Sequence, residues 1–112
     1  MTDVVALSAE DFAGVVLQRT GVWMVDFFTP WCAPCKALES VFEELSANND
    51  GGVHFSTLNI AEHPATAEAL DVATAPTIII FVDGAEQRRL FGAKTARQLN
   101  VAIEGVTAQN HA

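Results

Sequence analysis

Two cysteines, Cys32 and Cys35, are the residues of this 112-residue chain whose type and spacing most directly suggest chemistry. They are the only cysteines in the sequence. A disulfide between them closes a very short loop and therefore removes little conformational entropy from the unfolded chain. A purely structural bridge is thus a poor explanation for the pair, which leaves a metal site or a redox reaction to consider.

The local sequence places the pair between a strand and a helix. Residues 22–28, VWMVDFF, form an apolar run that is typical of a strand covered on both faces. From Pro34 onward, apolar residues recur at helical spacing, and proline is tolerated in a first helical turn. The free N–H groups and positive dipole of a helix start favour a thiolate. We therefore expect Cys32 to attack a disulfide and Cys35 to resolve the mixed disulfide that forms.

A zinc site is the main alternative, because two cysteines at this spacing also begin many zinc sites. Zinc would need two further ligands. The three histidines, His54, His63 and His111, are scattered without the paired spacing of metal ligands. The sequence therefore predicts no metal site.

Asp26 is the one charged residue inside the predicted central strand. A buried carboxylate is costly unless it is paired, hydrogen-bonded or protonated. Desolvation is expected to raise its pKa, and a carboxyl group poised nearer neutrality can exchange a proton with a cysteine. A buried aspartate that only makes hydrogen bonds is the alternative interpretation.

The remaining sequence predicts an alternation of strands and helices. Ser8 can cap a helix that runs to about residue 18, and Asp83-Gly84 is a hairpin signal. Further predicted elements are strands near residues 3–7 and 53–60, two strands within residues 77–93 joined by this hairpin, and helices at 64–72 and about 95–106. This order predicts a single α/β domain over residues 1–112, with a central mixed sheet and helices on both faces. Arg88 and Arg89 are expected to protect an exposed edge strand.

Composition limits the class of partner. Six basic and fourteen acidic residues give a net charge of −8, which disfavours nucleic acid and anionic membrane surfaces. The first twenty residues lack the pattern of a signal peptide, and no apolar stretch is long enough to span a bilayer. We therefore expect a cytoplasmic protein, in a reducing compartment where a close cysteine pair is more often catalytic than structural.

Three separated motifs occur in order along the chain: VDFFTPWCAPCK (25–36), TAPTIIIF (74–81) and FGA (91–93). Together they resemble the thioredoxin family. The first is similar to the family's strand and redox loop, the second to its proline-led strand, and the third to the glycine site that faces the cysteines. The resemblance covers essentially the full chain and implies the thioredoxin fold.

The resemblance also implies roles for individual residues. Pro76 matches the family's cis-proline, whose preceding backbone binds an extended substrate segment, and Asp26 matches the residue that exchanges a proton with Cys35. Trp31 is expected to offer substrate an apolar contact, although a packing role is the alternative. The implied substrate-binding set is Trp31, Ala75, Pro76, Gly92 and Ala93, and Pro34 and Lys36 are implied to modulate the redox pair.

This sequence departs from the family pattern at several positions. Ala33 replaces the glycine of the usual Trp-Cys-Gly-Pro-Cys, and Ala75 is smaller than the usual residue before the proline. Thr57 stands where many bacterial members have a lysine near the buried aspartate. Asp26 therefore lacks that cationic partner.

The resemblance predicts a monomeric protein disulfide reductase with no bound cofactor, which receives reducing equivalents from a thioredoxin reductase and passes them to disulfide-containing proteins. The loop is also similar to the FYAPWC-like loops of protein disulfide isomerase, so a thiol oxidase or disulfide isomerase is one alternative. Those loops usually have histidine where this chain has Pro34, which favours the reductase. A thioredoxin-like binding module is the alternative from outside the enzymes.

Overall fold

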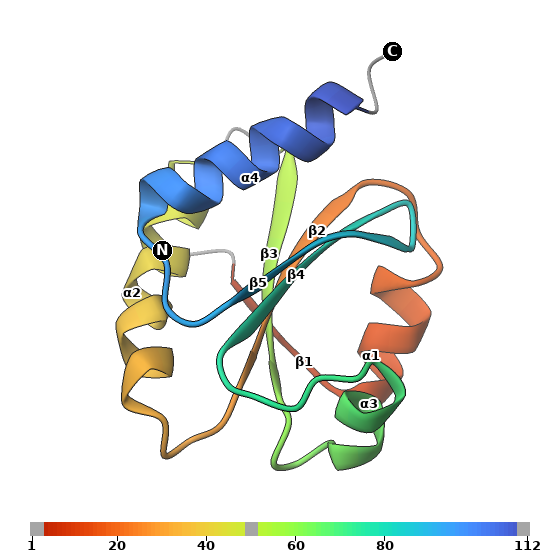
Figure 1. Cartoon of the computed structure of the whole chain (residues 1–112). Helices are drawn as coiled ribbons and strands as arrows, with labels where there is room; N and C mark the ends of the chain where they lie inside the picture. Colours follow the sequence, from red (N-terminus) through yellow and green to blue (C-terminus); the bar gives the residue numbers. More distant parts are fainter. Residues whose placement is uncertain (1–3, 49–51, 110–112) are drawn as a thin grey trace.

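The computed structural model describes residues 4–48 and 52–109, and within them the strands form one mixed sheet (Figure 1). The strand order is β1-β3-β2-β4-β5. β1 and β2 both run parallel to β3, whereas β4 is antiparallel to β2 and to β5. The strands are β1 (Val5–Leu7), β2 (Val22–Phe28), β3 (Val53–Asn59), β4 (Thr77–Val82) and β5 (Ala85–Phe91).

Helices cover both faces of the sheet, as the sequence predicts. Figure 1 shows α2 and α4 on one side and α1 and α3 on the other. The helices are α1 (Ala9–Asp11), α2 (Ala33–Ala47), α3 (Pro64–Ala69) and α4 (Ala96–Gln109). The predicted α/β fold class is therefore confirmed.

The first helix differs from the sequence prediction. Ser8 caps α1 as expected, because its hydroxyl accepts the Asp11 N–H at 3.0 Å. The chain then widens into a π-helical segment, Phe12–Val16, in which the Leu17 N–H donates to the Phe12 carbonyl. This segment buries both Phe12 and Val16 against the sheet. The predicted regular helix is thus replaced by a short α-turn followed by a wider one.

The alternation of side chains along β2 fixes which residues face α2. Trp23, Val25 and Phe27 belong to the apolar cluster on the side of α1 and α3. Met24 belongs to the cluster that includes α2 and α4 residues, such as Leu38, Phe42 and Leu99. Because successive strand residues point to opposite faces, Asp26 lies on the same face as Met24. The carboxyl group is thereby directed toward α2.

The turn between β4 and β5 confirms the hairpin signal. Asp83 and Gly84 have φ angles of 51° and 84°, the left-handed values that a tight two-residue hairpin needs. A side chain at Gly84 would also collide with the backbone of Leu17. The Asp83 carboxylate in turn accepts the Gly21 N–H at 2.7 Å, which ties the hairpin to the start of β2.

Arg89 has a different role from the edge protection predicted for it. Arg88 is exposed on the edge strand β5, but the Arg89 side chain is only 20% exposed. Its guanidinium group pairs with Glu86 and donates to the carbonyls of Leu70 and Asp71 at 2.7 and 3.0 Å. Arg89 therefore joins β5 to the end of α3, a contact between segments 18 and 19 residues apart.

Candidate active site

The cysteine pair lies at the junction of β2 and α2, as predicted. Cys32 is the N-cap residue of α2, and Cys35 lies in its first turn. Cys32 and Cys35 form a disulfide with a Cα–Cα distance of 5.2 Å. Cys35 is buried, with 4% of its surface exposed, whereas Cys32 is half-buried. Of the two sulfur atoms, the one that a substrate can reach therefore belongs to the N-cap residue.

The helix start directs a backbone donor at the Cys32 sulfur. The Cys35 N–H donates to Cys32 Sγ at an N–S distance of 3.2 Å. This donor has no carbonyl acceptor within the first turn, so it is available to stabilise negative charge on the sulfur. Pro34, which has no N–H of its own, occupies an exposed first-turn position where none is required.

The segment before β4 approaches the cysteines from the other side. The Ala75 carbonyl oxygen lies 3.7 Å from Cys32 Sγ, although the two residues are 43 positions apart. The Ala75-Pro76 peptide bond is cis. Ala75 is half-buried and Pro76 is buried, so the backbone of Ala75 is presented beside the more accessible sulfur.

Gly92 is required by its backbone conformation rather than by lack of space. Its φ angle is +82°, and a Cβ atom placed there would meet nothing within 4 Å. The Gly92 N–H donates to the Pro76 carbonyl at 2.9 Å, which brings the end of β5 next to the cis-proline. Ala93, the next residue, is exposed. The predicted glycine site is therefore brought together with Ala75 and Pro76.

Trp31 and Lys36 lie at the surface on either side of the disulfide in sequence. Trp31 is 77% exposed, so the alternative packing role is wrong. A large exposed ring next to Cys32 leaves an apolar surface free for a partner. Lys36 is also exposed.

Asp26 is buried as predicted, with 2% of its surface exposed. Its Oδ1 atom has no hydrogen-bond partner among the described residues. Its neighbours across the sheet are Thr57 on β3 and Ile78 on β4, so neither adjacent strand supplies a cation. Burial, and secondarily the charge of Glu39, raise the pKa of Asp26 from 3.8 to about 7. The predicted rise in its pKa is thus confirmed.

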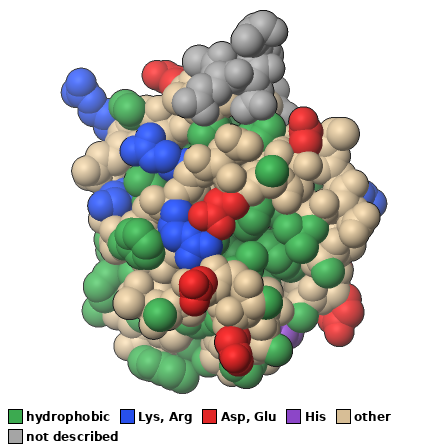
Figure 2. Space-filling model, turned by 45° about the vertical axis from the view of Figure 1, so that its right-hand side comes forward, with side chains coloured by type: hydrophobic (Ala, Val, Ile, Leu, Met, Phe, Trp, Pro, Cys, Tyr) green, Lys and Arg blue, Asp and Glu red, His purple; other side chains and the backbone are tan. Residues whose placement is uncertain are grey.

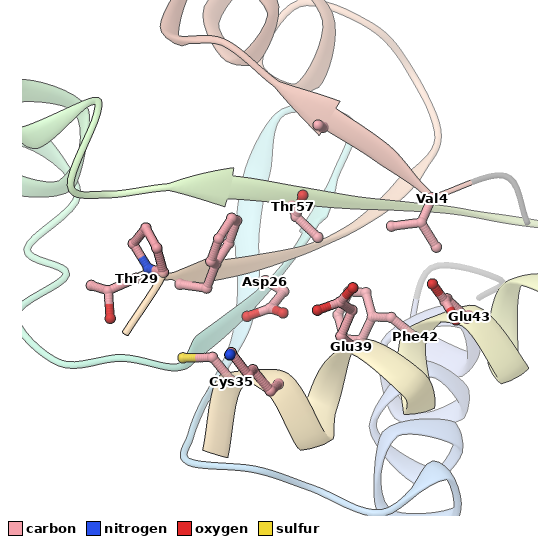
Figure 3. A pocket seen from close by; sticks show the side chains of 12 residues that line it. Val4, Asp26, Thr29, Cys35, Glu39, Phe42, Glu43 and Thr57 are labelled. Carbon is pink, nitrogen blue, oxygen red and sulfur yellow. The ribbon is translucent and has the colours of Figure 1, made fainter. Parts of the chain in front are cut away.

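A pocket of about 390 Å³ connects Asp26 with Cys35. Figure 3 shows the carboxyl groups of Asp26 and Glu39 facing one another across this pocket, with Thr57 on the sheet side. The sequence did not lead us to expect Glu39 beside Asp26. The helical spacing gives a partial signal, because Glu39 is four residues after Cys35 and so lies on the same helical face, but it does not show which strand residue lies opposite.

Two features are absent from the described residues 4–48 and 52–109. No group of three or more His, Cys, Asp or Glu side chains there is arranged to hold a metal ion. No helix in the same ranges has the length and apolar character needed to cross a membrane.

The arrangement suits sulfur exchange. A half-exposed sulfur has a backbone donor directed at it, a second cysteine lies within bonding distance, and a titratable carboxyl group adjoins that second cysteine through a shared pocket. A dithiol that opens and closes as a disulfide at a helix start is the site of a thiol–disulfide oxidoreductase.

Known proteins are similar to this chain in sequence and in fold. The thioredoxin family model matches residues 3–105. A thioredoxin from Chlamydia caviae is 43% identical over 88 residues, which make up 79% of this chain and 83% of that protein. A thioredoxin from Staphylococcus aureus strain Mu50 is 35% identical over 101 residues, or 90% of this chain and 95% of that protein.

A solved structure agrees with these sequence relatives. The crystal structure of Malassezia sympodialis thioredoxin matches with a TM-score of 0.83 and 28% identity, covering 94% of this chain and 91% of that one. The chain belongs to the thioredoxin family. Its activity is that of a protein-disulfide oxidoreductase, which reduces protein disulfides by dithiol–disulfide exchange at its Cys-x-x-Cys pair.

Proposed function

We propose that Cys32 is the attacking and Cys35 the resolving cysteine of this exchange, and that Asp26 handles the proton of Cys35. The observation that carries this assignment is the contrast between the sulfur atoms. Cys32 is half-exposed and accepts a backbone N–H, whereas Cys35 is buried beside the pocket of Asp26. An attacking thiolate needs access and stabilisation, and a resolving thiol needs a base.

The reaction proceeds in two exchanges. The Cys32 thiolate attacks one sulfur of a substrate disulfide, and the other substrate sulfur leaves as a thiolate that takes a proton from water. Cys35 then gives its proton to the Asp26 carboxylate and attacks Cys32 Sγ. The second substrate thiolate leaves and is protonated, so the substrate gains two electrons and the Cys32–Cys35 disulfide forms.

The substrate site in this proposal comprises Trp31, Ala75, Pro76, Gly92 and Ala93. Its support is the exposed ring of Trp31 and the carbonyl of Ala75 beside Cys32 Sγ. An extended substrate segment can align with the backbone of Ala75, as peptides do at the edges of sheets. Pro34 and Lys36 are proposed to modulate the pair from the first turn of α2.

Family membership implies a thioredoxin reductase and disulfide-bearing proteins as partners. We propose that this chain works in the reducing direction with such a reductase, as a single-domain, monomeric protein of the cytoplasm that holds no cofactor. Pro34 supports the reducing direction, since isomerase-type loops usually have histidine there.

Two assays test the proposal. The Cys35→Ser variant is expected to accumulate a mixed disulfide with oxidised insulin, and Cys32→Ser is not, because only the former keeps the attacking thiol. Equal trapping by the two variants would contradict the assignment. Wild-type protein should also reduce insulin catalytically when a thioredoxin reductase and its electron donor are supplied.

The reduction potential tests the direction independently. Thioredoxin itself is known to lie at about −270 mV, and a strong thiol oxidase at about −120 mV. We expect a value close to that of thioredoxin. A potential close to the oxidase value, with no insulin turnover, would favour the oxidase or isomerase alternative.

A further inference from the structure

Two carboxyl groups from different elements meet in the pocket next to Cys35. Asp26 comes from β2 and is almost completely buried, with Oδ1 unpartnered among the described residues. Glu39 comes from the second turn of α2 and is exposed, so its carboxylate remains hydrated while facing the pocket (Figure 3). The exchange reaction uses the first group in the function proposed above and leaves the second without a role.

The fold fixes this meeting on both sides. Along β2, alternation turns Asp26 toward α2 together with Met24. Along α2, Cys35 and Glu39 are four residues apart and therefore project from one helical face. A charge at position 39 is thus held opposite Asp26 by secondary structure, and does not depend on the conformation of a loop.

The charges around Asp26 are predominantly negative. The ionisable side chains that line the pocket besides Asp26 and Cys35 are Lys36, Glu39 and Glu43, all from α2. β3 contributes the uncharged Thr57, and β1 and the segment before it contribute only Ala6 and Val4. β4 places Ile78 beside Asp26. Of these charged groups, Glu39 is the one that raises the pKa of Asp26.

We propose that Glu39 is a positioning residue of disulfide exchange that acts through Asp26: its negative charge holds the proton on the Asp26 carboxyl group and so sets the pH range in which Cys35 is activated. This inference rests on the proton-handling role proposed for Asp26. A neighbouring anion disfavours a second negative charge in the same pocket, and the low polarity around Asp26 strengthens the effect.

The consequence differs between the two directions of the reaction. When the Cys32–Cys35 disulfide is opened by an incoming thiolate, Cys35 leaves as a thiolate, and a protonated Asp26 can supply its proton. When a mixed disulfide is resolved, Asp26 must first be a carboxylate in order to accept the Cys35 proton. Because Glu39 keeps Asp26 protonated to higher pH, it extends efficient disulfide opening to higher pH and moves the onset of efficient resolution to higher pH as well.

The test compares Glu39→Gln with a matched control, Glu43→Gln. Both variants remove one negative charge from the same helix and the same pocket wall. The titration of Asp26 is followed by ¹³C NMR of its carboxyl carbon, and the resolving step by stopped-flow reduction across pH. We expect Glu39→Gln to move both midpoints to lower pH by about half a unit to one unit, and Glu43→Gln to move them much less. Glu39→Asp should largely retain the wild-type midpoints.

Each contrary outcome has a distinct meaning. Equal shifts in Glu39→Gln and Glu43→Gln would reduce the effect to general charge and overturn the proposal. An unchanged Asp26 midpoint in Glu39→Gln would overturn it directly. If the Asp26 midpoint moves while the resolving step does not, the proton role of Asp26 fails, and with it the link from Glu39 to catalysis.

A double variant separates action through Asp26 from direct action on Cys35. In an Asp26→Asn background, Glu39→Gln should leave the pH profile of the resolving step unchanged, because the group that transmits its effect is gone. A shift of the same size in that background would show that Glu39 acts on the cysteine itself and would overturn the proposed route.

Discussion

Asp26, the residue proposed to handle the Cys35 proton, also affects the stability of the fold through its burial. Its pKa in the folded protein, about 7, lies above its ordinary value of 3.8 because burial disfavours the charged form and Glu39 adds to that effect. Folding therefore favours the protonated carboxyl group. As pH rises from about 4 to about 7, the unfolded chain loses this proton before the folded protein does, and the fold becomes less stable.

The first prediction compares wild type with Asp26→Asn, which keeps the shape of the side chain and removes the titration. The two should have similar free energies of unfolding near pH 4. Above pH 7 the variant should be more stable, by an amount on the order of 4 kcal/mol at most. Urea denaturation at a series of pH values measures the difference.

Asp26→Ala provides a control for packing. It should reproduce the pH dependence of Asp26→Asn but be displaced to lower stability by a constant cavity cost of about 1 to 3 kcal/mol. If the free energy of unfolding of both variants differs from that of wild type by the same amount at every pH, the pKa of Asp26 is not raised by desolvation.

At the scale of elements, Arg89 joins the edge strand β5 to the end of α3. Its guanidinium group donates to two carbonyls, those of Leu70 and Asp71, where a helix end leaves acceptors unpaired. Glu86 holds the same group through two contacts of 2.8 Å. The segment that leaves α3 here continues to Ala75 and the cis-proline, so this contact anchors one end of the segment proposed to bind substrate.

The second prediction is that Arg89→Ala lowers the free energy of unfolding by about 1 to 3 kcal/mol, because the partly buried carbonyl of Leu70 and the exposed carbonyl of Asp71 lose a charged donor. Arg89→Lys should recover only part of the loss, since an ammonium group cannot span both carbonyls and Glu86. Arg88→Ala is the matched control, because it removes the same charge from an exposed neighbouring position. It should stay within about 0.5 kcal/mol of wild type.

Denaturation and substrate kinetics together decide whether the anchor matters for function. A rise in KM for insulin in Arg89→Ala, at temperatures where the variant is fully folded, is expected if the anchor positions Ala75. If Arg88→Ala and Arg89→Ala lower the free energy of unfolding by the same amount, protection of the edge strand is the better explanation for both residues.

At the scale of the whole molecule, both faces of the sheet are covered and both edges are poor templates for pairing. β1 has three residues, and β5 carries exposed charged residues including Glu86 and Arg88. The face in Figure 2 has hydrophobic patches interrupted by acidic and basic side chains. The exposed large apolar residues of the described surface are Val5, Leu17, Trp31, Phe91 and Val101, from several separate elements. Large, continuous apolar patches are what usually mark stable self-association.

The third prediction follows from these surfaces and from the net charge of −8. The protein should sediment as a single species of 12.0 kDa at micromolar concentration in both redox states. High salt screens the repulsion between copies without creating an interface, so the mass should not change. A dimer that appears only in high salt would show that repulsion, and not the lack of an apolar interface, keeps the chain monomeric.

The amino-acid sequence by itself determined most of the local structure. The apolar run of β2, the hairpin at Asp83-Gly84 and the helix start at the cysteines depend on side-chain periodicity and on a few turn residues, which act over short distances. The same local information predicted that Asp26 is buried with a raised pKa, because a carboxyl group within a seven-residue apolar strand has few other environments available. The family motifs then supplied the fold.

Only the tertiary structure decided which distant residues meet. The approach of the Ala75 carbonyl to Cys32, the contact of Arg89 with the end of α3, and the opposition of Glu39 to Asp26 each depend on strand order and on how a helix is seated against the sheet. A periodic pattern shows which side of α2 is apolar, but Glu39 lies at the boundary of that side. Glu39 faces Asp26 because β2 lies beneath this part of α2. That placement results from packing of the whole chain.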